Sequence, residues 1–342
     1  QYSSMLAVKN EENEIKDEIV ESLLRVCRKK IPEVFGRYFK VKAQRLGVPV
    51  LSRYDLFAPI KPERKTFSFN QAFTEVIESF KDFDHELAEL AQKVYASKRL
   101  SACISNGKFY GAFSLCAYPG DIPWVSMNYE GYRRDFFNLA HELGHAVHFL
   151  LASNLSFLEF HPAPPLAEMA SCLGEMLMAK RLREKSDQSD LEVTSFELMD
   201  VIYETVGRTA FFTIFEYEAH RLIKQGAGPS EISEAYLKNL KEHFGQAVLV
   251  PDDFRFEWLS IDQFFRNPFF FYLYDFGNLL VYSLWALFQN DRASFCSKMK
   301  ALLALGGSAS TEQALSQVGF GPLDDHFWTR GFEVIESFIP KD

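Results

Sequence analysis

The sequence predicts a mainly α-helical fold with one small β-sheet near its middle. Apolar residues recur at helical spacing through most of the 342 residues. Only residues 103–130 combine glycine and proline punctuation with short β-prone runs. Because no internal repeat or long linker divides the chain, we expect a single domain over residues 1–342.

The first helices are expected on both sides of a proline. Apolar side chains in residues 15–31 recur at helical spacing with charges between them. Pro32 is expected to interrupt or restart this helix, because proline lacks the N–H that an inner helical residue donates. Residues 33–46 continue the pattern until Gly47, and a second long amphipathic pattern covers residues 71–100.

Short strands and further helices follow. Residues 111–115 and 124–129 are β-prone runs joined by a Pro-Gly turn, which predicts two or three short strands. Helical spacing returns over residues 187–225, and Pro229-Ser230 is expected to open a helix that runs through Phe244.

One stretch, residues 269–288, approaches the length of a membrane-spanning helix. It carries Asp275, Gly277 and Asn278 near its middle, and aspartate is costly at the centre of a bilayer. We therefore expect a buried helix that lines something polar, and no membrane partner.

The charge balance and the cysteines exclude several classes. Lys+Arg 37 against Asp+Glu 46 leaves a net charge of −9, whereas nucleic-acid binders usually carry a basic surplus. The 5 cysteines form no C-x-x-C pair, which argues against a disulfide framework and against a cysteine zinc site. No signal-peptide pattern opens the sequence. We expect reduced thiols and a cytoplasmic location; the cysteines are Cys27, Cys103, Cys116, Cys172 and Cys296.

The motif HELGH lies in a helix predicted over about 136–152, with Asp135 as its N-cap. His141 and His145 are four residues apart, so both imidazoles lie on one helix face and can reach one ion. Glu142 adjoins this face, where it can take a proton from a water molecule. This is the pattern of zinc peptidases, and it predicts one Zn²⁺ per chain with two histidine ligands and a glutamate base.

A third ligand is expected from a second helix, over about 165–183. Glu168 lies in its first turn among apolar residues, where a carboxylate is costly unless it is paired or bound to a metal. Glu175 follows on the same face and can orient a ligand histidine, although a partly solvated glutamate explains it nearly as well. His148 is expected in the second shell or in the core, because catalytic zinc usually keeps three protein ligands.

The run GKFYGAFSLCAYPGDIPWVSMNYEGYRRDFFNLAHELGHAVH resembles the oligoendopeptidase F branch of the M3 zinc metallopeptidases. In that family a Glu-x-x-Ser helix supplies the third ligand, which maps onto Glu168 to Ser171. The resemblance extends over residues 46–60 and 215–226. It implies a zincin-type metallopeptidase catalytic domain, with a small β-sheet beside the HExxH helix, that hydrolyses internal bonds of short peptides. Family members normally carry a further N-terminal helical region, which we expect to be absent, separate or removed here.

The C-terminal tract departs from the family pattern, which has a histidine followed by Pro-Phe-Tyr-x-Tyr-x-Tyr. Gln263 stands at the histidine position and Phe270 at the first tyrosine, while Tyr272 and Tyr274 remain. Glutamine still donates a hydrogen bond but carries no charge. The resemblance therefore implies that Tyr272 or Tyr274 stabilises the oxyanion and that Gln263 contacts substrate.

The strand that contains Gly111, Ala112 and Phe113 is expected to bind an extended peptide by β-addition, because it lies just before the zinc helix.

Three functions remain open. The first is a zinc oligoendopeptidase, which the intact Glu142 favours. The second is a degenerate M3-like metal-binding protein that binds peptides with little or no cleavage, which Gln263 and Phe270 motivate. The third is a zinc carboxypeptidase, which the products would distinguish. Mn²⁺ or Co²⁺ can also occupy such a ligand set.

Overall fold

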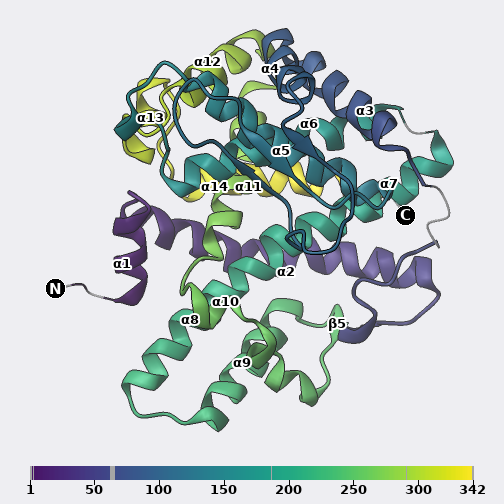
Figure 1. The fold of residues 1–342 in the computed structure, drawn as a ribbon. Coiled ribbons are helices and arrows are strands. Elements are labelled where there is room, and N and C mark those ends of the chain that lie inside the picture. Colours follow the sequence, from purple (N-terminus) through teal and green to yellow (C-terminus); the bar gives the residue numbers. More distant parts are fainter. Residues whose placement is uncertain (1, 3, 62–65, 186, 290, 341–342) are drawn as a thin grey trace. The chain divides into compact units, whose positions relative to one another are not determined.

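The computed structural model describes every residue except 1, 3, 62–65, 186, 290 and 341–342 (Figure 1). It confirms the mainly helical prediction, since the described strands are only two or three residues long. The described chain divides into two compact units, and two helices have residues in both of them. The prediction of one domain over residues 1–342 stays a prediction. The terminal unit comprises Gln1–Lys61, Ser195–Ser283 and Leu323–Asp342, and the central unit comprises Pro62–Thr194 and Leu284–Pro322.

Within the terminal unit, α2 (Asp17–Leu46) is one continuous helix of 30 residues (Figure 1). The predicted interruption at Pro32 is wrong. A proline inside a helix costs about 3 kcal/mol, but one face of α2 buries several large apolar side chains, among them Leu23 and Phe35, and each buried side chain contributes about 1.5–3 kcal/mol. The helix ends at Gly47, as predicted, and the structure places this glycine in the left-handed conformation with φ 70°.

The C-terminal helix α14 (Asp325–Glu336) runs parallel to α2. Arg25, near the start of α2, pairs with Asp325 at 2.7 Å, and Arg37, further along, pairs with Glu336. The other elements with residues in the terminal unit are α1 (Met5–Glu12), β1 (Leu51–Ser52), η1 (Arg53–Asp55), α7 (Gln188–Ile202), the π-helix η3 (Tyr203–Arg208), α8 (Thr209–Lys224), α9 (Pro229–Phe244), β5 (Val248–Leu249), η4 (Asp252–Ser260), α10 (Gln263–Arg266) and α11 (Tyr272–Phe288).

The stretch of near-membrane length forms α11, which begins at Tyr272 rather than at residue 269. Asp275 is fully buried in it and accepts a hydrogen bond from the Thr209 hydroxyl of α8. The prediction of a buried helix beside a polar group is thus confirmed. Among the described residues, no helix has the length and apolar character that crossing a membrane requires.

The central unit holds the small sheet, whose strand order is β2-β4-β3. β4 pairs in parallel with β2 and antiparallel with β3, with Ser114 opposite Val125. β3 and β4 lie inside the two predicted runs. The pattern over residues 71–100 forms two helices instead of one, because Asp84 caps the second of them. The elements are α3 (Phe69–Phe83), α4 (His85–Ala96), β2 (Leu100–Ser101), β3 (Phe113–Leu115), β4 (Trp124–Ser126), α5 (Arg133–Leu151), η2 (Phe157–Glu159), α6 (Pro164–Lys185), α12 (Arg292–Ala304) and α13 (Thr311–Gln317).

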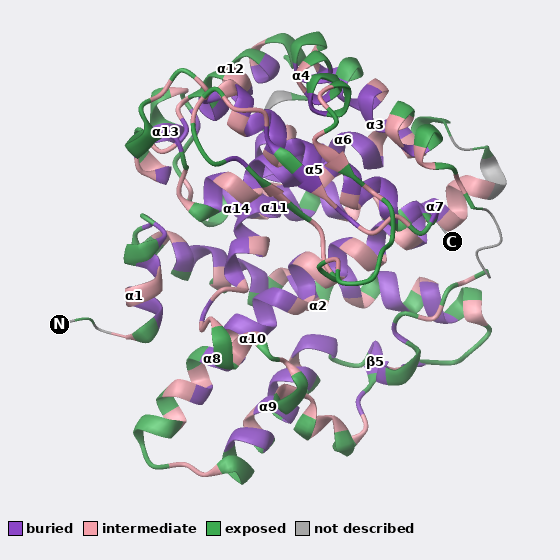
Figure 2. Cartoon of the chain, in the orientation of Figure 1, coloured by how far each residue is buried: buried purple, intermediate pink, exposed green. Residues whose placement is uncertain are grey.

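The helices α5 and α6 cross in very close contact in the centre of this unit, and most residues of α5 are buried (Figure 2). A Cβ atom added to Gly144 of α5 would lie 2.6 Å from the Ala170 carbonyl oxygen of α6. A Cβ atom added to Gly174 of α6 would lie 2.3 Å from the Ala140 carbonyl oxygen of α5. Both glycines are therefore required for the two backbones to touch.

We expect Gly144→Ala to destabilise the protein although alanine is the better helix former. The helix propensity gain is about 1 kcal/mol, but the added methyl meets backbone atoms that cannot move aside, and such overpacking costs about 1–3 kcal/mol. Thermal unfolding measures the difference. Gly36→Ala in α2 is the matched control, because its Cβ would meet only Ala247 at an ordinary 3.8 Å. A Gly144→Ala protein as stable as the Gly36→Ala protein would contradict the close-contact argument.

Candidate metal centre

The helix α5 begins at Arg133, and Asp135 is its third residue instead of its N-cap. The carboxylate of Asp135 accepts hydrogen bonds from the backbone N–H groups of Glu130 at 2.9 Å, Gly131 at 2.7 Å and Tyr132 at 3.1 Å. The prediction that Asp135 is the N-cap is therefore wrong, because Asp135 lies inside the helix. Asp135 still fixes the chain as it enters the helix, because it binds three donors in the turn ahead of it.

The two motif histidines and Glu168 converge in the central unit. The rings of His141 and His145 are 4.9 Å apart between centroids, as their spacing on one helix face predicts. Oε2 of Glu168 lies 3.7 Å from Nε2 of His141 and 3.9 Å from Nε2 of His145. Within the described part of the chain, these three residues are the one group of three or more histidine, cysteine or acidic side chains whose ligand atoms lie close enough together to hold a metal ion.

The donor set fits a divalent transition metal. All three ligand atoms lie within 4.8 Å of one another. Donors bound to zinc at about 2.0–2.2 Å in a tetrahedron are roughly 3.4 Å apart, so small side-chain shifts bring them into range. Two imidazoles and one carboxylate leave the fourth position open, which is the arrangement of catalytic zinc sites. The residues therefore fit the group that the motif implies.

Glu168 enters from α6, which begins at Pro164, one residue before the predicted start. Glu168 consequently lies beyond the first turn of the helix instead of within it. Burial raises the pKa of the Glu168 carboxyl, and His141 opposes that shift. The Ser171 hydroxyl donates to the Glu168 backbone carbonyl at 2.8 Å, which ties the serine of the Glu-x-x-Ser pattern to its own helix turn.

Glu175 lies behind His141, with its Oε1 atom 2.6 Å from the Nδ1 atom of the ring. Burial disfavours a charged imidazole here, but Glu175 and the two neighbouring glutamates outweigh it and raise the pKa of His141 to about 9. Since Nδ1 of His141 contacts Glu175, its other ring nitrogen, Nε2, faces Glu168. A carboxylate in this position fixes the ring tautomer that a metal ligand needs.

His145 and His148 have different surroundings. Burial lowers the pKa of His145, so its ring is neutral, which is the form that binds a metal. Burial lowers the pKa of His148 to about 4, and its ring hydrogen-bonds to the Leu303 backbone of α12. His148 is buried and is not part of the three-residue donor group. Its surroundings are those of a satisfied core histidine, one of the two alternatives expected for it.

Glu142 lies on α5 beside the candidate ligand His141 and is only 5% exposed. Its Oε2 atom has no hydrogen-bond partner among the described residues. Burial raises the pKa of this carboxyl to about 7, although His141 acts in the opposite direction. A carboxyl group with a pKa near neutrality is well suited to accept and return a proton.

Ser114 connects the sheet to this helix, and the sequence patterns did not single it out beyond its place in a predicted strand. Its hydroxyl donates to the Glu142 backbone carbonyl at 2.6 Å. The signal that could have found it is strand alternation, since Ser114 lies between the exposed Phe113 and Leu115. Gly174 was missed too, although it stands four residues after Ala170 and shares its helix face.

Gly111, Ala112 and Phe113 lie in the central unit, in and just ahead of β3, whereas the two tyrosine candidates and Gln263 lie in the terminal unit. Tyr272 is fully buried, and its hydroxyl accepts a hydrogen bond from the Asn13 side chain at 2.6 Å. Tyr274 is half-buried, and its ring lies 5.5 Å from that of Phe270. Gln263 is half-buried at the start of α10. The oxyanion and substrate roles of these residues stay predictions.

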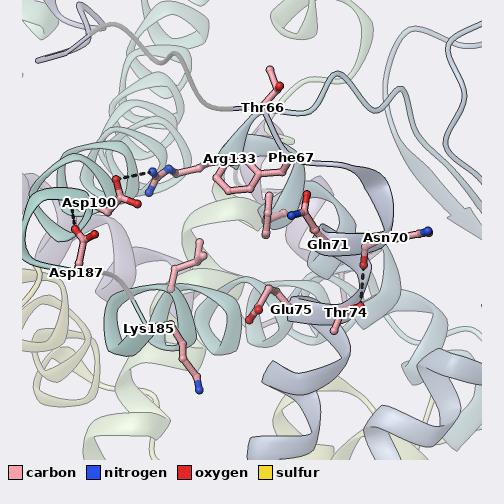
Figure 3. A pocket seen from close by; sticks show the side chains of 12 residues that line it. Thr66, Phe67, Asn70, Gln71, Thr74, Glu75, Arg133, Lys185, Asp187 and Asp190 are labelled. Atoms are coloured by element: carbon pink, nitrogen blue, oxygen red, sulfur yellow. Dashed lines mark hydrogen bonds and ion pairs between the residues drawn. The ribbon is translucent and has the colours of Figure 1, made fainter.

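A separate cavity of about 670 Å³ lies in the central unit between α3 and the ends of α5 and α6 (Figure 3). The ring of Phe67 and the side chain of Arg133 lie on one side of it, with Arg133 directed at Asp190 at 3.4 Å. Polar residues of α3 lie opposite, and none of the three candidate metal ligands lines the cavity.

Comparison with known proteins finds similarity to peptidases. The sequence model of Peptidase family M3 matches residues 1–334. An oligoendopeptidase F homolog of Borreliella burgdorferi is 26% identical over 314 residues, which cover 90% of this chain and 53% of that relative. Oligopeptidase PepF of Bacillus subtilis is 24% identical over 281 residues, which cover 81% of this chain and 41% of that relative. The chain thus spans about half the length of the curated relatives it matches.

Two crystal structures show the same fold. A protein of Chlamydophila abortus superposes with a TM-score of 0.86 at 24% identity, over 99% of this chain and 57% of that one. Oligoendopeptidase-F from Enterococcus faecium superposes with a TM-score of 0.72 at 21% identity, over 99% of this chain and 55% of that one. Since the family model covers nearly the whole chain, the protein belongs to peptidase family M3.

Proposed function

We propose that the protein is a zinc-dependent oligoendopeptidase that hydrolyses internal bonds of short peptides. The observation that carries the proposal is the convergence of His141, His145 and Glu168 beside the buried carboxyl of Glu142. Membership of peptidase family M3 and the names of the relatives support a peptidase. The five free cysteines favour a reducing compartment, so the cytoplasm is the proposed location.

His141, His145 and Glu168 would hold the ion. Zinc in such a site supplies a Lewis acid, which makes a water molecule acidic and polarises a carbonyl group. Glu142 then acts as the base: its unpaired Oε2 atom accepts the proton of the attacking water and later delivers it to the leaving amine. Glu175 acts through His141, whose ring it holds in one orientation.

The sheet would bind the substrate backbone. β3 pairs with β4 alone among the described strands, so its second edge is open to an extended peptide. Gly111 and Ala112, just ahead of β3, add little bulk along that edge. An added peptide would lie next to α5, because Ser114 ties β3 to the Glu142 carbonyl.

Tyr272 and Tyr274 stay the two proposed candidates for the oxyanion donor. The Tyr272 hydroxyl is buried against Asn13, whereas Tyr274 is half-buried. Phe270 cannot donate, and Gln263 can donate only as a neutral group. A peptide-binding relative with little or no cleavage remains the second candidate function, because of these two substitutions.

We expect a metal chelator to abolish cleavage of internally quenched peptides, and Glu142→Gln to lower kcat by a factor of about 10²–10⁴, because glutamine cannot accept the proton. Fluorescence assays on the purified chain, with mass spectrometry of the products, measure both. Glu89→Gln, an exposed residue of α4, is the matched control and should leave the rate unchanged. Cleavage that survives chelation would contradict the metal mechanism, and release of single C-terminal residues would indicate a carboxypeptidase.

We expect Glu175→Gln to weaken zinc binding by a factor of about 10–100, because the amide holds the His141 ring less firmly than the carboxylate does. Glu168→Ala, which removes a ligand, should weaken it further. Competition with a chromophoric chelator measures both affinities without any need for activity. If Glu175→Gln binds zinc as tightly as the Glu89→Gln control, Glu175 has no orienting role.

A further inference from the structure

The small sheet presents an apolar face on the side away from the candidate metal centre. Ser114 faces α5, where its hydroxyl donates to the Glu142 carbonyl at 2.6 Å. Successive side chains of a strand point to opposite faces, so Phe113 and Leu115 point away from α5. Both are exposed, at 39% and 56%.

Two further aromatic residues extend this face. Leu115 is paired across the sheet with Trp124 of β4, which is 50% exposed. The ring of Phe109 lies 6.0 Å from the ring of Phe113 and is 65% exposed. We call these four residues, Phe109, Phe113, Leu115 and Trp124, the outer apolar face. The Arg99 guanidinium stacks on Trp124 at 4.2 Å and borders the face on that side.

This face continues to the open edge of the sheet. β3 is the edge strand, so Phe113 and Leu115 adjoin the position that an added peptide strand would occupy. Side chains directly opposite one another on neighbouring strands have Cβ atoms about 4.5–5.5 Å apart. Two peptide side chains separated by one residue would therefore contact Phe113 and Leu115, while the residue between them points toward α5.

We propose that Phe113 and Leu115 determine specificity, by selecting peptides that carry apolar side chains at two positions separated by a single residue. The inference rests on the proposed function and adds a substrate class to it. Apolar pairs across strands are favourable relative to alanine pairs, by an amount that corresponds to roughly 1.4- to 5-fold in affinity for each pair. This contact is made equally in the ground state and the transition state, so it should act on KM and not on kcat.

The test uses three quenched peptide series of equal length and charge. The first carries Leu-Gly-Leu, the second Leu-Leu-Gly and the third Ser-Gly-Ser, each moved stepwise along the peptide. We expect the best Leu-Gly-Leu peptide to have a KM roughly 1.4- to 5-fold below that of the best Leu-Leu-Gly peptide, which keeps one apolar pair, and roughly 2- to 25-fold below that of Ser-Gly-Ser, with kcat within about twofold. The first two series are equally hydrophobic, so a difference in KM between them reports the alternating pattern and not nonspecific hydrophobic binding.

Protein variants supply the second arm. Phe113→Ser and Leu115→Ser should each raise KM for the Leu-Gly-Leu peptide roughly two- to fivefold and reduce the preference over Ser-Gly-Ser. Phe157→Ser and Leu158→Ser make the same chemical changes at exposed positions of η2 and should leave KM unchanged. Circular dichroism and thermal unfolding verify that all four variants are folded.

The outcomes separate this inference from the proposed function. Cleavage with equal KM for all three series overturns the inference and leaves the peptidase intact. Peptide affinities measured by fluorescence anisotropy on Glu142→Gln test the selection without turnover, so discrimination there without cleavage by the native chain supports the inference and overturns the peptidase. No binding and no cleavage overturns both. Unchanged KM in the variants together with an altered oligomeric state would show that a second copy covers the face, and would also overturn the inference.

Discussion

The candidate site depends on the close crossing of α5 and α6. Ala140 and Gly144 on one helix meet Ala170 and Gly174 on the other, and the two glycines leave no room for a Cβ atom between the backbones. Small residues spaced four apart form a flat stripe on each helix, which permits this distance. Because α5 carries both histidines and α6 carries Glu168, the crossing is what brings a carboxylate from a distant part of the sequence to the imidazoles.

The same crossing concentrates charge in a poorly solvated place. Glu142, Glu168 and Glu175 surround His141, and burial raises the pKa of both Glu142 and Glu168. Burying several ionised carboxyl groups together costs free energy when no cation is near them. A divalent ion would be the largest local charge and would offset this cost. The proposed metal centre with an adjacent base would account for this arrangement of acidic side chains around two histidines.

The sheet links the candidate site to its surroundings. The Ser114 hydroxyl donates a short hydrogen bond to the Glu142 backbone carbonyl. This bond holds β3 against the turn of α5 that carries Glu142. Because successive side chains of β3 point to opposite sides, the two faces of the strand have different surroundings. One face contacts the helix that carries the candidate ligand histidines, and the other exposes apolar side chains beside an unpaired strand edge.

Much of the fold and of the candidate site could be predicted from the sequence, because both rest on local patterns. Helical spacing located α9 and α6 to within one or two residues, and the spacing of His141 and His145 placed them on one face. A carboxylate in an apolar helix pointed to Glu168. These features need only the periodicity of a helix and the cost of burying a charge.

Local patterns were insufficient where packing between distant segments decides. Pro32 stays inside a continuous α2 because burial of one helix face outweighs the missing hydrogen bond. Asp135 and Asp84 were misjudged for a different reason: their contacts are local, with the turn ahead of α5 and with the first turn of α4, but a hydrophobic pattern does not show which acidic residue makes such a contact. The sequence by itself determined which residues are the candidate metal ligands and the candidate base, and which helix faces they occupy. Only the tertiary structure decided that α5 and α6 touch through glycine, that Glu175 holds His141 and that Ser114 joins the sheet to Glu142, since these contacts join residues far apart in the chain.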